Sequence, residues 1–161
     1  LFSYVMDGFA YAGEALSGKY IGARDAIAFR NTVRRLFVWG AGMVILFTAA
    51  YALGGNGFLS LLTDEPEVIA ASSEYFFWAL AIPLTGVTAF VWDGVFIGAT
   101  ATRGMLVAMA VAALCFFGCY FGLRDAWGNH ALWLAFLLYL AMRGAVQTGL
   151  ARGVEQKSFK V

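Results

Sequence analysis

The sequence predicts an all-α fold, a polytopic membrane helical bundle of about five transmembrane helices. Hydrophobic residues make up 61% of its 161 residues and charged residues only 13%, whereas ordinary soluble domains are about 25% charged. A soluble core of this size could not bury so much apolar surface, so the chain is expected in a lipid bilayer. Because backbone polar groups in lipid must pair within the chain, the apolar segments should be helices.

Five apolar segments are the expected spans, and each is close to the roughly 20 residues that cross a bilayer. They cover residues 1–22, 36–53, 75–100, 105–123 and 127–150, so that residues 1–153 form one domain and 154–161 a cytoplasmic tail. Acidic residues interrupt the first span, and the third contains Pro83, which should bend its helix. The second and fourth spans are uncharged, and the fifth continues past Arg143. The chain opens with Leu1 inside a hydrophobic segment, which predicts a fragment of a longer protein.

The connections between the spans carry most of the charge. Residues 24–35 contain four arginines together with apolar side chains, which predicts an amphipathic connection lying on the inner leaflet. In the next connection, Asp64 and Glu67 resemble a capping box, and Pro66 should lie in the first turn of the helix that follows.

Basic residues are distributed unevenly, and this distribution predicts the orientation. Ten of the eleven fall on one side of the predicted bundle, with Arg124 on the other. Lys and Arg gather on the cytoplasmic side of membrane proteins, so that side and the C-terminus should be cytoplasmic. Arg143 lies nominally within the last span and should extend its side chain to the inner surface. The net charge of only +1 argues against a nucleic-acid partner.

Acidic residues inside the first span are candidate functional residues. A carboxylate at membrane depth is costly and usually handles ions or substrate. Asp7 and Glu14 share one stripe of the first helix with Tyr11 and Gly18, and this stripe should face the bundle interior or an aqueous cavity. The two carboxylates either couple transport to a proton or cation, or pair with a basic group on a neighbouring helix.

Asp93, in the third span, is a candidate cation site. It follows Pro83 by ten residues and immediately precedes Gly94. Gly94 and Gly98 have the G-x-x-x-G spacing that lets another backbone approach closely. Its carboxylate, with hydroxyl or backbone oxygens, could bind a hard cation such as Na⁺, or a proton. His130, expected in an outer loop, is the sole histidine and an alternative proton relay.

Four stretches resemble, in order, the second half of multidrug and toxic compound extrusion (MATE) transporters, in the DinF-like branch. They are DGFAYAGEALSGKYIGA, LLTDEPEVI, WDGVFIGATATRGM and WGNHALWLAFLLYLAMRG, and the resemblance covers nearly the whole chain. It implies a carboxyl-terminal lobe in which these spans correspond to helices 8–12 of a twelve-helix fold. It also implies a bacterial inner-membrane antiporter, not an enzyme, that exports drugs or other organic cations with H⁺ or Na⁺ as the coupling ion and no other cofactor. The missing amino-terminal lobe and membrane lipid would be its partners.

The resemblance also bears on the acidic residues. Asp93 matches the acid of the tenth helix in the family's carboxyl-lobe cation site, whereas Ala89 stands where sodium-coupled members have tyrosine. Asp7 and Glu14 match positions typical of the branch's eighth helix, and their coupling roles are inferred from their shared stripe.

Two other functions are alternatives to a drug exporter. A lipid-linked oligosaccharide flippase of the same superfamily would need basic residues along its cavity for pyrophosphate, but here they are expected at the cytoplasmic side. An intramembrane aspartyl protease would use Asp7 and Asp93 as a dyad, but the G-x-G-D pattern of such enzymes is absent.

Overall fold

The computed structural model describes residues 2–60 and 65–159, which form five α-helices and, within those two ranges, no strand. The helices are α1 (Phe2–Gly22), α2 (Ala26–Ser60), α3 (Pro66–Gly98), α4 (Thr102–Trp127) and α5 (Asn129–Phe159). The predicted all-α fold is therefore confirmed, and each helix contains most of one predicted apolar segment. The segment 75–100 runs two residues beyond the end of α3, and the segment 127–150 begins two residues before α5.

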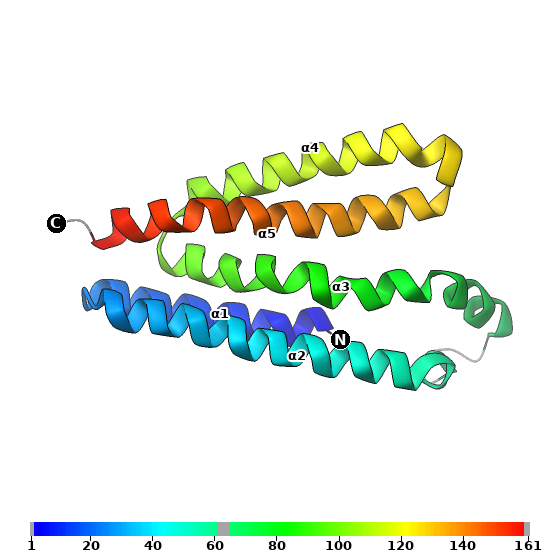
Figure 1. Cartoon of the computed structure of the whole chain (residues 1–161), viewed down its shortest axis with the longest axis horizontal. Helices are drawn as coiled ribbons and strands as arrows, with labels where there is room; N and C mark the ends of the chain where they lie inside the picture. The colour runs from blue at the N-terminus through cyan, green and yellow to red at the C-terminus, as the bar shows by residue number, and fades with distance from the viewer. Residues whose placement is uncertain (1, 61–64, 160–161) are drawn as a thin grey trace.

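Helix α3 lies at the centre of the bundle (Figure 1). It packs against α1 and α2 on one side and against α5 on the other, while α4 packs mainly on α5. The second half of α3 is accordingly buried on several faces, with Ala89, Val91, Val95 and Phe96 almost inaccessible. A polar residue in this part of α3 must therefore find its partner inside the bundle.

Four of the five helices are long and apolar enough to cross a membrane: Ala26–Gly54, Glu74–Gly98, Thr102–Trp127 and Asn129–Phe159. Helix α1 was also predicted to span but falls outside this group, because Asp7, Glu14 and Lys19 interrupt its 21 residues.

Residues 24–35 differ from the prediction of a separate amphipathic connection. Only Ala23, Arg24 and Asp25 separate the first two helices, and Arg24 takes a positive φ of 56° there. The Asp25 carboxylate accepts a hydrogen bond from the Ala28 amide (2.8 Å) and caps α2, which then continues without a break into its apolar part. Nothing between Ala26 and Leu36 is a helix breaker, so the arginines extend α2 instead of forming a separate segment.

Helix α3 begins with Pro66 at its first position, as predicted, and its N-cap is Glu65. The expected cap, Asp64, lies outside the described residues. Helix α3 continues through Pro83 without interruption.

The G-x-x-x-G motif of α3 is a packing surface for α1. A Cβ atom at Gly94 would lie 2.8 Å from Ala10 Cα, and one at Gly98 would lie 2.9 Å from Ser17 Cβ. These distances leave no room for a side chain, so the predicted close approach of a second backbone is confirmed. The same spacing at Gly118 and Gly122 has no such role, because both face open space.

Candidate functional site: a buried polar cluster between α3 and α5

Asp93 lies between α3 and α5, where only 9% of the residue is exposed. One carboxylate oxygen, Oδ2, forms a salt bridge with Arg143 Nη2, and the other, Oδ1, accepts a hydrogen bond of 2.7 Å from Gln147 Nε2. The Asp93 and Arg143 side chains are 13% and 16% exposed, and Gln147 is fully buried. Both oxygens of the carboxylate are therefore bound to α5.

The sequence of α5 explains why this face meets Asp93. Arg143 and Gln147 are four residues apart, so they lie one above the other on the same side of the helix. Gly144 lies beside them, and a Cβ atom there would be 2.9 Å from Thr88 Cβ and 3.2 Å from the Ala89 nitrogen. The missing side chain lets the α5 backbone approach α3 closely enough for both polar side chains to reach Asp93.

Arg143 was expected to extend to the inner surface, and that expectation is wrong. It is near the middle of α5, and its guanidinium is inside the bundle because Asp93 neutralises it there. The sequence contained a usable signal, since Arg143, Gly144 and Gln147 form a polar and small-residue stripe in an otherwise apolar segment. Gln147 was not predicted as a functional residue from the sequence.

Unused hydrogen-bonding capacity remains within this cluster. Arg143 Nε and Gln147 Oε1 are buried, and neither has a hydrogen-bond partner among the described residues. Buried polar atoms are normally satisfied, because an unsatisfied one costs about 1–3 kcal/mol. The Arg143 Nε–H donor and the Gln147 Oε1 acceptor are therefore available for hydrogen bonds close to the Asp93 carboxylate.

Asp7 and Glu14 lie on a different surface. Both are half-buried, and neither has a hydrogen-bond or ion-pair partner in the portion of the chain that is described. The buried residues of α1 are Phe2, Met6, Gly13 and Ser17, whereas Tyr11, in the middle of the predicted stripe, is 71% exposed. The middle of the stripe therefore faces away from the interior of these five helices, whereas Gly18, at its end, packs against Gly98 of α3. Asp7 and Asp93 do not hydrogen-bond to each other, so no carboxylate dyad is formed.

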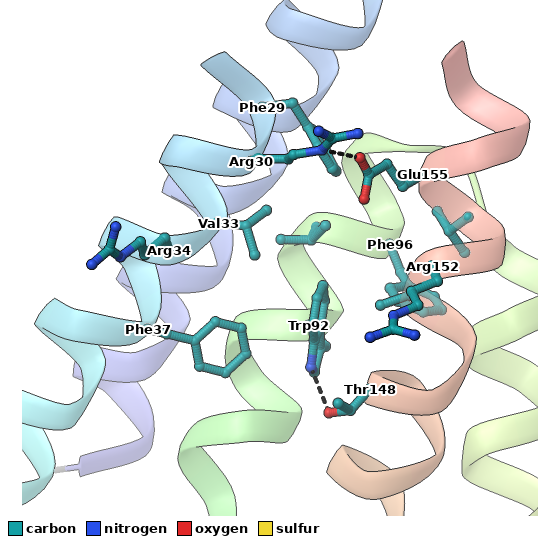
Figure 2. A pocket seen from close by; sticks show the side chains of 13 residues that line it. Phe29, Arg30, Val33, Arg34, Phe37, Trp92, Phe96, Thr148, Arg152 and Glu155 are labelled. Carbon is teal, nitrogen blue, oxygen red and sulfur yellow. Dashed lines mark hydrogen bonds and ion pairs between the residues drawn. The ribbon is translucent and has the colours of Figure 1, made fainter. Parts of the chain in front are cut away.

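A second contact between α3 and α5 is formed by Trp92, which precedes Asp93, and Thr148, which follows Gln147. Trp92 Nε1 donates a hydrogen bond of 2.8 Å to Thr148 Oγ1, and that hydroxyl donates to the Gly144 carbonyl at 2.7 Å. Beside it is a pocket of about 350 Å³ between α2, α3 and α5, and Arg30 of α2 reaches across it to an ion pair with Glu155 of α5 (Figure 2).

His130 lies in the first turn of α5 and not in a loop. Its Nδ1 accepts a hydrogen bond from Trp78 Nε1 (3.1 Å), and its Nε2 lies 3.6 Å from Glu74 Oε1. The histidine thus ties α3 to α5 at the end of the bundle away from the chain's C-terminus.

A cation at Asp93 would have few acidic ligands. Among the described residues, no three His, Cys, Asp or Glu side chains lie close enough to hold a metal ion together. Gln147 Oε1 is a further buried oxygen of the cluster, and the positively charged Arg143 is paired with the carboxylate. A proton or Na⁺ could bind at Asp93 only in competition with Arg143.

Comparison with known proteins gives a family. The MatE family profile matches residues 1–120. The chain is 40% identical over 143 residues to DNA damage-inducible protein F of Escherichia coli (strain K12), covering 88% of this chain and 31% of that protein. It is 28% identical over 147 residues to Protein DETOXIFICATION 42 of Arabidopsis thaliana, covering 89% of this chain and 28% of that protein.

The chain thus spans about a third of the length of the curated relatives it matches. No solved structure matches it significantly. The family match covers most of the sequence and agrees with the long apolar helices of the bundle, and the chain belongs to the MatE family.

Proposed function

We propose that this chain is part of a cation-coupled antiporter that exports drugs or other organic cations across a membrane by alternating access. Membership of the MatE family and the word "detoxification" in a relative's name support an export function. The observation that carries the proposal is the buried carboxylate of Asp93, held by Arg143 between two helices long enough to span a bilayer. Such a charge at membrane depth is retained where it serves ion movement.

The coupling step in this proposal is a competition for the Asp93 carboxylate. A proton or Na⁺ that reaches Asp93 displaces Arg143, and Gln147 Oε1 supplies a further oxygen ligand. The displaced guanidinium is then a buried charge without a counterion, which is strongly unfavourable. Helices α3 and α5 must shift relative to each other to relieve it, and this shift would change the balance between inward-open and outward-open states.

Asp7 and Glu14 have a second role in the proposal. Their carboxylates are half-buried, have no partner among the described residues, and lie on a side of α1 that these five helices cover only in part. Because the relatives are about three times as long as this chain, an amino-terminal lobe would complete a substrate cavity next to this face. The two acids would there exchange protons or attract a cationic drug.

The proposed orientation places the C-terminus in the cytoplasm of a bacterium, as the charge distribution predicts. At one end of the bundle α1 ends, α2 begins, α3 passes into α4, and α5 ends (Figure 1). Most basic residues lie on the helix segments that meet there: Lys19, Arg24, Arg30, Arg34, Arg35, Arg103, Arg152 and Lys157. Of the ten basic residues predicted on the cytoplasmic side, Arg143 instead lies inside the bundle, and Lys160 lies outside the described residues.

Replacing Asp93 by Asn in the intact gene product tests the proposal. The amide cannot exchange a proton or balance Arg143, so drug export should fall to the level of cells without the transporter, while the protein still reaches the membrane. The measurement is efflux of a fluorescent organic cation, with membrane abundance measured by immunoblotting.

The control is the double variant D93N/R143Q, which removes both charges and avoids an unpaired arginine. If its export is also lost although its membrane abundance is normal, Asp93 acts in coupling. Normal export by either variant would contradict the proposed role of Asp93.

A further inference from the structure

The pocket between α2, α3 and α5 has features that the export mechanism does not use. It lies at the basic end of the bundle, and its lining includes Val33 and Phe37 from α2 and Trp92 and Phe96 from α3. We propose that it binds one anionic phospholipid of the adjacent leaflet, with the acyl chain against the aromatic wall and the phosphate at the arginine rim.

The inner part of the pocket suits a hydrocarbon chain. The Phe37 and Trp92 rings meet edge to face with centroids 5.2 Å apart, and Trp92 contacts Phe96 in the same way at 6.0 Å. The Trp92 indole nitrogen is already bound to Thr148, so this wall offers mainly apolar surface (Figure 2). The volume of about 350 Å³ is at the small end of known ligand pockets and fits part of an acyl chain rather than a whole lipid.

The rim of the pocket has an excess of positive charge. Three arginines and one glutamate line it. Arg30 is paired with Glu155, whereas Arg34 of α2 and Arg152 of α5 are exposed and have no ion pair in the part of the chain the structure describes. The Arg152 guanidinium points toward the aromatic wall, and the Arg34 side chain points away from the pocket and would have to turn to reach a phosphate at the rim (Figure 2). Guanidinium groups bind phosphate oxygens through strong, bidentate hydrogen bonds. An organic cation would be repelled here, so the charge selects an anionic occupant.

The position of the pocket along the bundle agrees with a lipid occupant. Trp92 lies six residues before the end of α3, which places the aromatic wall about 9 Å below the helix end at 1.5 Å per residue. Arg34 and Arg152 lie eight and seven residues from the corresponding ends of α2 and α5, so a phosphate bound by them would lie close to this wall. Phe37 is three residues deeper along α2 than Arg34 and would contact the upper acyl chain. Basic pockets between transmembrane helices on the cytoplasmic side bind anionic head groups. The inference requires that the helices span a bilayer with the basic end at the leaflet that holds the anionic lipid, and it stands whether or not Asp93 couples transport.

Native mass spectrometry of the detergent-purified protein tests the selectivity. The protein is offered equal amounts of phosphatidylglycerol and phosphatidylcholine with the same acyl chains. We expect the first bound lipid to be phosphatidylglycerol by about tenfold, since each basic residue near an anionic lipid contributes to binding. The variant R34Q/R152Q should bring the ratio close to one. Both side chains are exposed, so the variant should fold.

A matched control separates a site from general attraction. The variant R24Q/R103Q removes the same number of charges from the same end of the bundle, but neither residue lines this pocket. It should keep the wild-type selectivity. Equal loss in both double variants, or no preference in the wild type, would overturn the proposal.

Fluorescence quenching tests the location of the bound chain. Phosphatidylglycerol with brominated acyl chains should quench the wild-type protein more than brominated phosphatidylcholine does, and Trp92→Phe should remove most of this difference. An unchanged difference in the Trp92 variant would place the lipid elsewhere. Displacement of the lipid by an equal concentration of sodium phosphate would show a free-anion site instead and would also overturn the assignment.

Discussion

Two Asp-Gly pairs in this chain have the same local sequence character and opposite surroundings. Gly94, after Asp93, is pressed against Ala10 of α1, and Asp93 itself is bound on both oxygens by α5. Gly8, after Asp7, has no atom within 4 Å of a Cβ position, and Asp7 has no partner among the residues described. The difference comes from the helices that surround each pair. Helix α3 has neighbours on both sides, whereas α1 is covered on one side only.

The α3–α5 surface and the outer side of α1 suit different functions. On the α3–α5 surface, charge is compensated and packed, so a change in it must be accompanied by movement of a helix. On the outer side of α1, charge is free to meet another group without any rearrangement of these helices. The first arrangement suits a conformational switch and the second suits initial capture of an ion or drug.

The largest expected change in the free energy of unfolding comes from replacing Arg143 alone. Arg143→Gln leaves the Asp93 carboxylate buried without its counterion, and breaking a buried pair in this way typically costs about 3–5 kcal/mol. The free energy of unfolding, measured by adding SDS to the protein in mild detergent micelles, should fall by that order.

The double variant D93N/R143Q should recover much of the loss, since it leaves no unpaired charge. If R143Q is as stable as the wild type, the ion pair does not hold α3 and α5 together, and the contrast with Asp7 disappears.

Replacing the glycine after each aspartate by alanine should have a smaller effect on the free energy of unfolding. Gly94→Ala would place a Cβ atom 2.8 Å from Ala10 Cα, so α1 and α3 must move apart, at a cost of about 1–3 kcal/mol for overpacking. Gly8→Ala meets nothing and should be neutral or stabilising by up to about 1 kcal/mol through helix propensity. The same SDS titration measures both variants, and equal effects would mean that the two sites are packed alike.

The architecture was largely accessible from sequence, because long apolar segments and the position of Lys and Arg depend on local composition. The G-x-x-x-G contact of Gly94 and Gly98 was also predicted from their spacing, but the same spacing at Gly118 and Gly122 makes no contact, so the spacing alone does not identify a packing surface. The partner of Asp93 was not predicted, because Arg143 is fifty residues away in sequence and the register between α3 and α5 is set by packing at Gly144. For the same reason Asp7 and Asp93 could not be told apart. Local spacing placed Asp7 on a stripe but did not show which side of α1 would be covered.

The smallest effect on stability is expected at α1. Asp7→Asn and Glu14→Gln remove charges that hold no partner within the described structure, so each should change the free energy of unfolding by no more than about 0.5 kcal/mol, as is usual for positions outside packed or hydrogen-bonded networks. In the intact gene product, however, each should weaken export of an organic cation if the α1 acids capture ions or drug. Stability and efflux measured on the same variants therefore separate the two surfaces: R143Q should lower both, and the α1 variants only efflux. A large loss of stability in Asp7→Asn would mean that this carboxylate has a structural partner, and that the two Asp-Gly pairs resemble each other more than their packing indicates.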